Sequence, residues 1–212
     1  METPNKKKLP VYNLLINEFD ESTEVNYISL VENPAIEVNF VTFSTENKSK
    51  FKFKIQDASK QMICGPMMIP NLPIYRVNPD TKEEYYVVMS EQTIENAVKK
   101  FAKKGFNTHI NAEHSVNVPG AYLMENWIIS DMKNDKSNLF GFSNLPVGTW
   151  MGIIHLENEA WNKYIMSGEL SIGGISVEGI FAQGEQVDSI SMQYSSDDFL
   201  SYLADLLLDN EF

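Results

Sequence analysis

The sequence contains few of the residues that build disulfides, zinc sites and phosphate-binding surfaces. Only one of its 212 residues is a cysteine, Cys64, and only one is an arginine, Arg76. A single cysteine excludes both an intramolecular disulfide and a cysteine-rich zinc site. Direct binding of nucleic acid needs clustered lysine and arginine, whereas this chain carries a formal net charge of −12. We therefore expect no nucleic-acid partner.

Long hydrophobic runs are also missing. No apolar stretch approaches the roughly 20 residues that a membrane-spanning helix requires. The lysines at 6–8 precede an apolar stretch as in a signal peptide, but Pro10 and Asn13 interrupt it and no small-residue cleavage site follows. Hydrophobic residues nevertheless make up 43% of the chain, which is enough for a folded core. The composition predicts an intracellular protein without a membrane partner, in which Cys64 is a buried thiol among methionines.

Hydrophobic periodicity divides the chain into three parts. Residues 1–50 are expected to form an extended N-terminal arm, 51–190 a domain of many short strands with helices packed outside, and 191–212 an amphipathic C-terminal helix. A further helix is expected after the N-cap Ser90, ending at the C′ glycine Gly105. Other elements are predicted as strands at 27–31, 36–43, 51–55, 85–89, 106–112, 121–132, 151–156 and 174–182, and as helices at 159–167 and 195–208.

The three histidines offer one convincing general base. His114 lies in a short polar segment, and an unperturbed imidazole titrates near neutral pH, as a general base should. A metal-dependent hydrolase using His109, Glu113 and His114 is an alternative, although two histidines five residues apart point to opposite faces of a strand. His155 alternates with apolar residues and is typical of a structural strand residue. The simplest alternative for His114 is a polar histidine at a strand end.

The segment Gly168–Gly179 combines glycines, β-branched residues and two serines, a setting that suits a nucleophile. Its end, from Gly174 to Gly179, resembles a G-x-S-x-G nucleophile elbow with one residue too many. Ser176 is the better candidate because strand alternation turns it away from its two apolar neighbours, whereas Ser171 falls in a turn. A glycine-rich turn leading into a strand, with Ser176 facing the interior, is the non-catalytic interpretation.

Several segments follow one another along the chain in a characteristic order: 27–36, Asn111–His114, Met124–Ile128, Pro146–Gly152, Glu159–Trp161 and Gly168–Gly179. In this order they resemble the prohead serine proteases of tailed phages, in particular the XkdF-like group. The resemblance implies an α+β, mainly β fold built on a herpesvirus-protease-like β-barrel surrounded by helices. It also implies an endopeptidase that cleaves scaffold and major capsid protein segments inside the prohead, in the host cytoplasm, with self-cleavage or self-association.

The resemblance also assigns roles to individual residues. The family's histidine and serine correspond to His114 and Ser176, and Glu125 matches an acidic position whose carboxylate is expected to orient the imidazole. Backbone N–H groups around Gly173 and Gly174 are expected to form the oxyanion hole. No cofactor or metal is implied.

Two features depart from the related herpesvirus assemblins. Those enzymes use a second histidine after the serine, and this chain has no histidine after His155. They also use arginine at the oxyanion, and the only arginine here, Arg76, lies far upstream. The departures keep open a catalytically inactive capsid-assembly or scaffold-like protein on a protease-derived fold, whose acidic C-terminal helix binds a partner.

Overall fold

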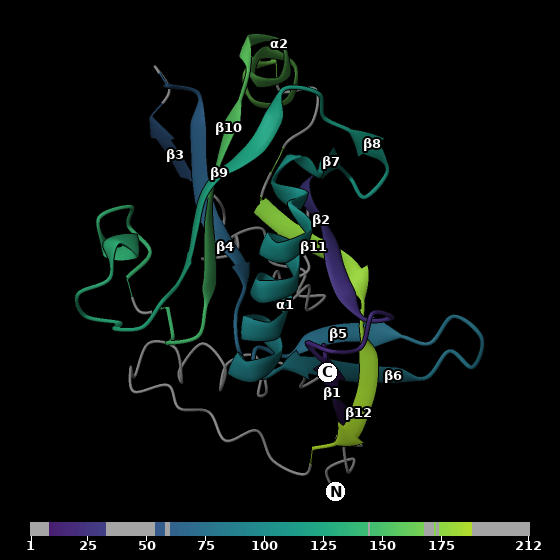
Figure 1. The fold of residues 1–212 in the computed structure, drawn as a ribbon. Coiled ribbons are helices and arrows are strands. Elements are labelled where there is room, and N and C mark those ends of the chain that lie inside the picture. Colours follow the sequence, from purple (N-terminus) through teal and green to yellow (C-terminus); the bar gives the residue numbers. More distant parts are fainter. Residues whose placement is uncertain are drawn as a thin grey trace, which may run out of the picture.

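Three four-stranded sheets packed around one long helix make up the described part of the chain (Figure 1). The computed structural model describes residues 9–32, 54–57, 60–143, 145–167, 172 and 174–187. Within these residues the sheets are open and none closes into a barrel. The expected α+β, mainly β class is therefore confirmed, whereas the herpesvirus-protease-like barrel is not found.

The first sheet, called here the β2 sheet, has the strand order β11-β2-β7-β8. Its central strand β2 is antiparallel to β11 and parallel to β7. Val25, Ile28 and Leu30 of β2 are completely buried, and this apolar content explains why the segment forms an inner strand. The strands are β2 (Glu24–Val31), β7 (Ile110–Ala112), β8 (Val116–Asn117) and β11 (Gly174–Ile180).

The second sheet, the β10 sheet, is antiparallel, and its inner strands β4 and β10 are buried on both faces. In β4, Ile63 and Met67 face one hydrophobic cluster, while Met62 and Cys64 face another. Burial raises the pKa of the Cys64 thiol to about 12, so the expected buried thiol is confirmed. In order across the sheet, its strands are β3 (Lys54–Asp57), β4 (Met62–Met68), β10 (Trp150–Leu156) and β9 (Ala121–Ile128).

The third sheet, the β1 sheet, has the order β12-β1-β6-β5. Strand β1 pairs with β12 on one side and with β6 on the other. The residues expected to form an extended N-terminal arm supply β1 and β2, which are inner strands of two different sheets. The other residues of that arm, 1–8 and 33–50, lie outside the described residues. The strands are β1 (Val11–Leu15), β5 (Ile74–Val77), β6 (Glu84–Met89) and β12 (Ala182–Gln186).

Helix α1 (Glu91–Lys104) lies between the β2 and β10 sheets (Figure 1). Ser90 Oγ accepts a hydrogen bond from Thr93 N at 3.1 Å, and Gly105 takes the left-handed conformation that ends the helix. Phe101 packs edge-on against Trp150 of β10, with ring centroids 5.4 Å apart. Both predicted caps are confirmed, because capping depends on local sequence.

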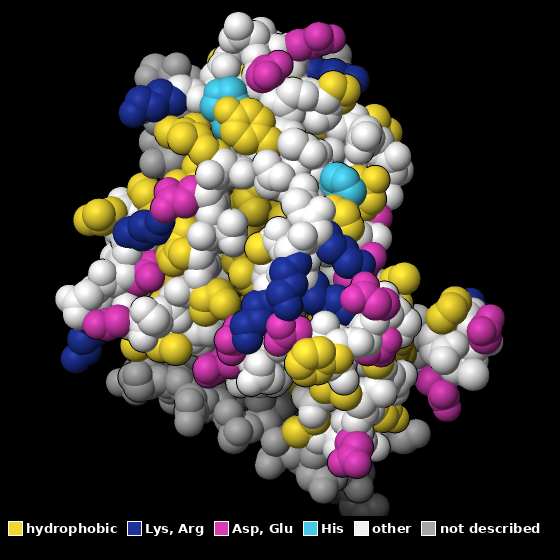
Figure 2. Space-filling model, in the orientation of Figure 1, with side chains coloured by type: hydrophobic (Ala, Val, Ile, Leu, Met, Phe, Trp, Pro, Cys, Tyr) yellow, Lys and Arg dark blue, Asp and Glu magenta, His cyan; other side chains and the backbone are white. Residues whose placement is uncertain are grey.

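Ion pairs join α1 to the turn between β1 and β2. Lys103 Nζ lies 2.7 Å from Glu18 Oε1, and Lys104 pairs with Glu21 and Glu24. Figure 2 shows lysine side chains gathered over this helix with acidic side chains beside them. Lys100 is buried and donates to the carbonyl oxygens of the same turn. These contacts fix the position where β2 begins.

Short helical segments complete the described chain. The strand expected at 106–112 is instead a 3-10 helix, η2 (Phe106–Thr108), followed by β7, because Gly105 turns the chain and His109 N donates back to Phe106 O. None of the described helices is long and apolar enough to span a membrane. The helix expected at 195–208 lies outside the described residues. The remaining segments are η3 (Lys136–Asn138), α2 (Asn158–Trp161) and the π-helix η4 (Asn162–Met166).

Candidate active site

A row of buried polar side chains crosses the β2 sheet. Ser29 of β2 is paired with Asn111 of β7 on one side and with Ser176 of β11 on the other. Residues opposite each other in adjacent strands have neighbouring side chains on one face. The three residues are only 0%, 5% and 3% exposed, respectively. Buried hydroxyl and amide groups need hydrogen-bond partners, so neighbouring polar side chains must satisfy this row.

The turn after β7 brings His114 to this row. Glu113 and His114 both have left-handed backbone conformations, with φ of 51° and 54°. Two hydrogen bonds hold the turn against the end of β2: Glu113 N donates to Leu30 O, and Glu32 N donates to Glu113 Oε1 at 2.6 Å. As a result, His114 Nδ1 lies 2.9 Å from Ser29 Oγ. Strain of this kind at a polar site is typical of functional residues.

Glu178 of β11 brings a carboxylate to the same place. It lies two residues after Ser176 and therefore on the same face of the strand. Its Oε2 is 3.1 Å from His114 Nδ1 and accepts a hydrogen bond from Asn111 Nδ2 at 3.2 Å. The register shifts between Glu178 and Gly179, with the extra residue, Asn26, in β2. A Cβ at Gly179 would overlap the carbonyl oxygen of Glu24, so glycine lets β11 approach β2 closely beside the carboxylate.

Four side chains therefore form a closed hydrogen-bonded ring, called here the polar ring. The Ser29 hydroxyl donates to Asn111 Oδ1, Asn111 Nδ2 donates to Glu178, and His114 Nδ1 contacts both Glu178 and Ser29. Ser176 lies next to the ring through its pairing with Ser29, but within the described residues its hydroxyl makes no hydrogen bond with His114.

Glu125 lies in another sheet and makes no hydrogen bond with His114 among the described residues. It is in β9, opposite Ile153 of the β10 sheet, and its carboxylate pairs with Lys136. The acidic residue beside His114 is Glu178, which the sequence reasoning missed. The sequence does contain a signal for it: Glu178 lies two residues after Ser176 on a predicted strand, and such residues share a face.

The other predicted site residues are placed as follows. Gly174 is the first residue of β11 and is paired with Val31, whereas Gly173 and Ser171 lie outside the described residues. His109 stacks between the rings of Tyr27 and Phe106, and its Nδ1 contacts Asn26 O at 3.0 Å. In the part of the chain that the structure describes, no three His, Cys, Asp or Glu side chains are grouped so that they could hold a metal ion.

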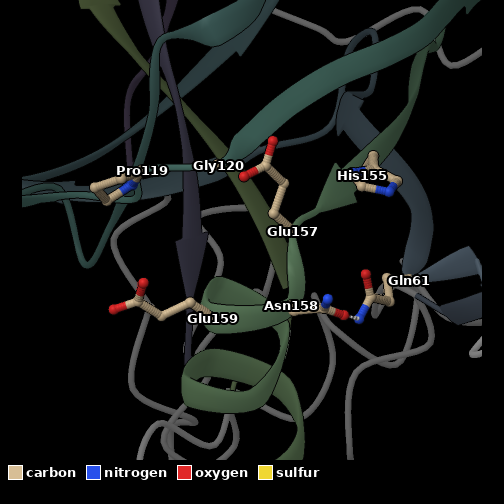
Figure 3. A pocket seen from close by; sticks show the side chains of 7 residues that line it. All are labelled: Gln61, Pro119, Gly120, His155, Glu157, Asn158 and Glu159. Carbon is tan, nitrogen blue, oxygen red and sulfur yellow. Dashed lines mark hydrogen bonds between the residues drawn. The ribbon is translucent and has the colours of Figure 1, made fainter.

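A separate pocket of about 540 Å³ lies at the start of α2 (Figure 3). Gln61 Nε2 donates to Asn158 Oδ1 at its edge, and the ring of His155 stacks on Tyr122. No member of the polar ring lines this pocket. Its lining consists of Gln61, Pro119, Gly120, His155, Glu157, Asn158 and Glu159.

Comparison with known proteins places the chain in a peptidase family. A family model described as "Putative phage serine protease XkdF" matches residues 51–185, which is more than half of the chain. Neither the curated proteins nor the solved structures gave a match. The matched segment contains His114, Ser176 and Glu178 and leaves out Ser29. The chain therefore belongs to the XkdF family of phage serine proteases.

Proposed function

We propose that this protein is a serine endopeptidase that acts inside the prohead, in the host cytoplasm, and cleaves segments of scaffold and capsid proteins during capsid maturation. The observation that carries the proposal is the contact between Glu178 Oε2 and His114 Nδ1 at 3.1 Å, next to the strand position of Ser176. A histidine oriented by a carboxylate near a serine is the arrangement that activates a hydroxyl nucleophile.

His114 acts as the general base through its Nε2 atom. An ionised carboxylate can only accept hydrogen bonds, so the proton of the neutral imidazole is on Nδ1, facing Glu178. The lone pair is then on Nε2, which is free to take a proton. Glu178 also stabilises the imidazolium that forms when this proton is taken up.

Ser176 is the proposed nucleophile. Its Oγ attacks the carbonyl carbon of the scissile peptide bond while its proton passes to His114 Nε2, and the imidazolium then protonates the leaving amine. Water hydrolyses the resulting acyl-enzyme ester. Backbone N–H groups at Gly173 and Gly174 are the proposed donors to the oxyanion. Ser29 is the less suitable serine because its hydroxyl proton is given to Asn111 Oδ1 and because it lies outside the family match.

A non-catalytic role in capsid assembly is the second candidate function. The burial of Ser176, which is 3% exposed, and its lack of a hydrogen bond with His114 in the described residues favour this alternative. Catalytic hydrogen bonds often tighten only when substrate binds, so the separation of Ser176 from His114 is compatible with catalysis.

Co-expression with the phage scaffold and capsid proteins tests the proposal. We expect Ser176→Ala and His114→Ala to abolish cleavage on a gel, while Ser171→Ala and Ser137→Ala retain it. Ser137 is a matched control, because it is an equally buried serine in the distant segment η3. A fluorophosphonate probe followed by peptide mass analysis identifies the nucleophile. Label on Ser29 would move the nucleophile to β2, and absence of both label and cleavage would favour the assembly role.

A further inference from the structure

We propose that Asn111 and Ser29 are positioning residues that hold His114 in the tautomer required for proton transfer. This inference rests on the proposed peptidase function and adds two residues to it. Both act through Glu178 and His114. They lie opposite each other in the parallel pair of β2 and β7, so the backbone fixes their relative position.

The carboxylate of Glu178 determines how the Asn111 amide is oriented. Glu178 Oε2 lies 3.2 Å from one end of that amide and 3.1 Å from His114 Nδ1. Because a carboxylate presents only acceptors, the amide end that faces it must be the NH₂ group. The carbonyl end, Asn111 Oδ1, then faces Ser29.

The orientation of this amide in turn fixes the proton of Ser29. Asn111 Oδ1 can only accept, so the Ser29 hydroxyl donates to it. The Ser29 oxygen is left with lone pairs, and it can meet His114 Nδ1 at 2.9 Å only if Nδ1 carries a hydrogen. A flipped Asn111 amide and the Nε2–H tautomer of His114 would place the amide oxygen and an unprotonated Nδ1 against the Glu178 carboxylate. Both contacts would be repulsive.

Burial prevents Ser29 and Asn111 from changing their hydrogen-bond partners. Ser29 is fully buried and Asn111 is 5% exposed, so neither can exchange its partner for bulk water at low cost. The other carboxylate at the turn, that of Glu113, accepts from Glu32 N. The polar ring therefore sets the tautomer through Asn111 and Ser29 as well as through Glu178.

The first test replaces the amide by an apolar group of similar shape. We expect Asn111→Leu to lower kcat roughly 10- to 100-fold, by analogy with the loss when the hydrogen-bond partner behind a metal-bound histidine is removed. KM should change less than about threefold, since no substrate contact is lost. Asn96→Leu is the matched control. Asn96 on α1 also donates one side-chain hydrogen bond, to Ile16 O at 2.8 Å, but it is remote from the site, and the control should cleave at the wild-type rate.

The second test measures the tautomer directly. The chain has only three histidines, so ¹⁵N-histidine labelling with a His114→Gln reference spectrum assigns the His114 ring. We expect the Nδ1–H form in the wild type and a shift toward the Nε2–H form in Asn111→Leu. A wild-type Nε2–H form, or an Asn111→Leu variant that keeps both the Nδ1–H form and its kcat, would overturn the inference. If the wild type cleaves nothing, the proposed function fails, but the spectra still decide the positioning role.

If Asn111→Leu does not fold, two variants of Ser29 test the same inference. Ser29→Ala removes the donor to Asn111 Oδ1 and should also lose the Nδ1–H form. Ser29→Thr keeps a hydroxyl at the same place and should restore it. If both variants give the wild-type spectrum, Ser29 has no positioning role and the inference is wrong.

Discussion

Two glutamates compete for the role of orienting His114, and they can be separated by the same substitution. Glu178→Gln should lower kcat by about two to four orders of magnitude, because loss of the orienting carboxylate leaves the imidazole in the wrong tautomer. Glu125→Gln should stay within about twofold of the wild type, since it breaks only an exposed ion pair with Lys136. Single-turnover cleavage of a co-expressed capsid protein gives both rates. Equal losses, or a larger loss in Glu125→Gln, would contradict the structure-based assignment.

Cys64 should be chemically inert in the folded protein. Burial raises the pKa of its thiol from 9.0 to about 12, so at pH 8 it is protonated and shielded. A disulfide reagent such as DTNB should react with it only after the protein unfolds, and rapidly in urea. The raised pKa also makes the stability of the folded protein depend on pH. Above pH 9 the unfolded chain loses this proton first, so the contribution of Cys64 to stability falls between pH 9 and about 12. Rapid stoichiometric labelling of the native protein would show that the β10 sheet opens.

At the scale of elements, the end of α1 allows a clean measurement of backbone strain. Gly105 has φ of 68°, and a Cβ there would meet no atom within 4 Å. Gly105→Ala should therefore lower the free energy of unfolding by about 1–2 kcal/mol through conformation alone. Gly105→Asn should lose less, since asparagine tolerates the left-handed region. Urea unfolding curves measure both. A loss well above this range in the alanine variant would mean that neighbouring atoms do move.

Elements with strong local signals were predictable from sequence, whereas the partners of the strands were not. The caps of α1 and the runs that became β6 and β10 carry local capping and hydrophobic patterns. Nothing local shows that β7 pairs with β2 or that β9 pairs with β10. Glu125 was named from the family resemblance, and Glu178 was missed because its place beside His114 depends on this sheet membership. His114 and Ser176 were found from residue type and family resemblance, and their roles remain predictions.

At the scale of the whole molecule, β1 and β2 should be indispensable. Each is hydrogen-bonded on both sides, β1 to β6 and β12, and β2 to β7 and β11. A chain that begins at residue 51 keeps the whole family-matched segment but leaves two sheets without their inner strands. We expect it to lose the cooperative urea transition of the full chain. A shortened chain with the same unfolding midpoint would mean that the N-terminal strands do not contribute to the stability of the fold.

The position of β2 between β7 and β11 also has a consequence for the order of events during translation. The ribosome delivers β2 early, but its partner β11 ends at Ile180, and β12, the partner of β1, ends at Gln186. Their other partners, β6 and β7, are made earlier, so each N-terminal strand keeps one edge unpaired until nearly all of the described chain has been made. Such exposed strand edges are targets for aggregation and for chaperones. The polar ring needs Glu178 as well as Ser29, so a nascent chain shorter than 178 residues cannot contain it. We therefore expect the proposed peptidase activity to be absent until most of the chain has been synthesised.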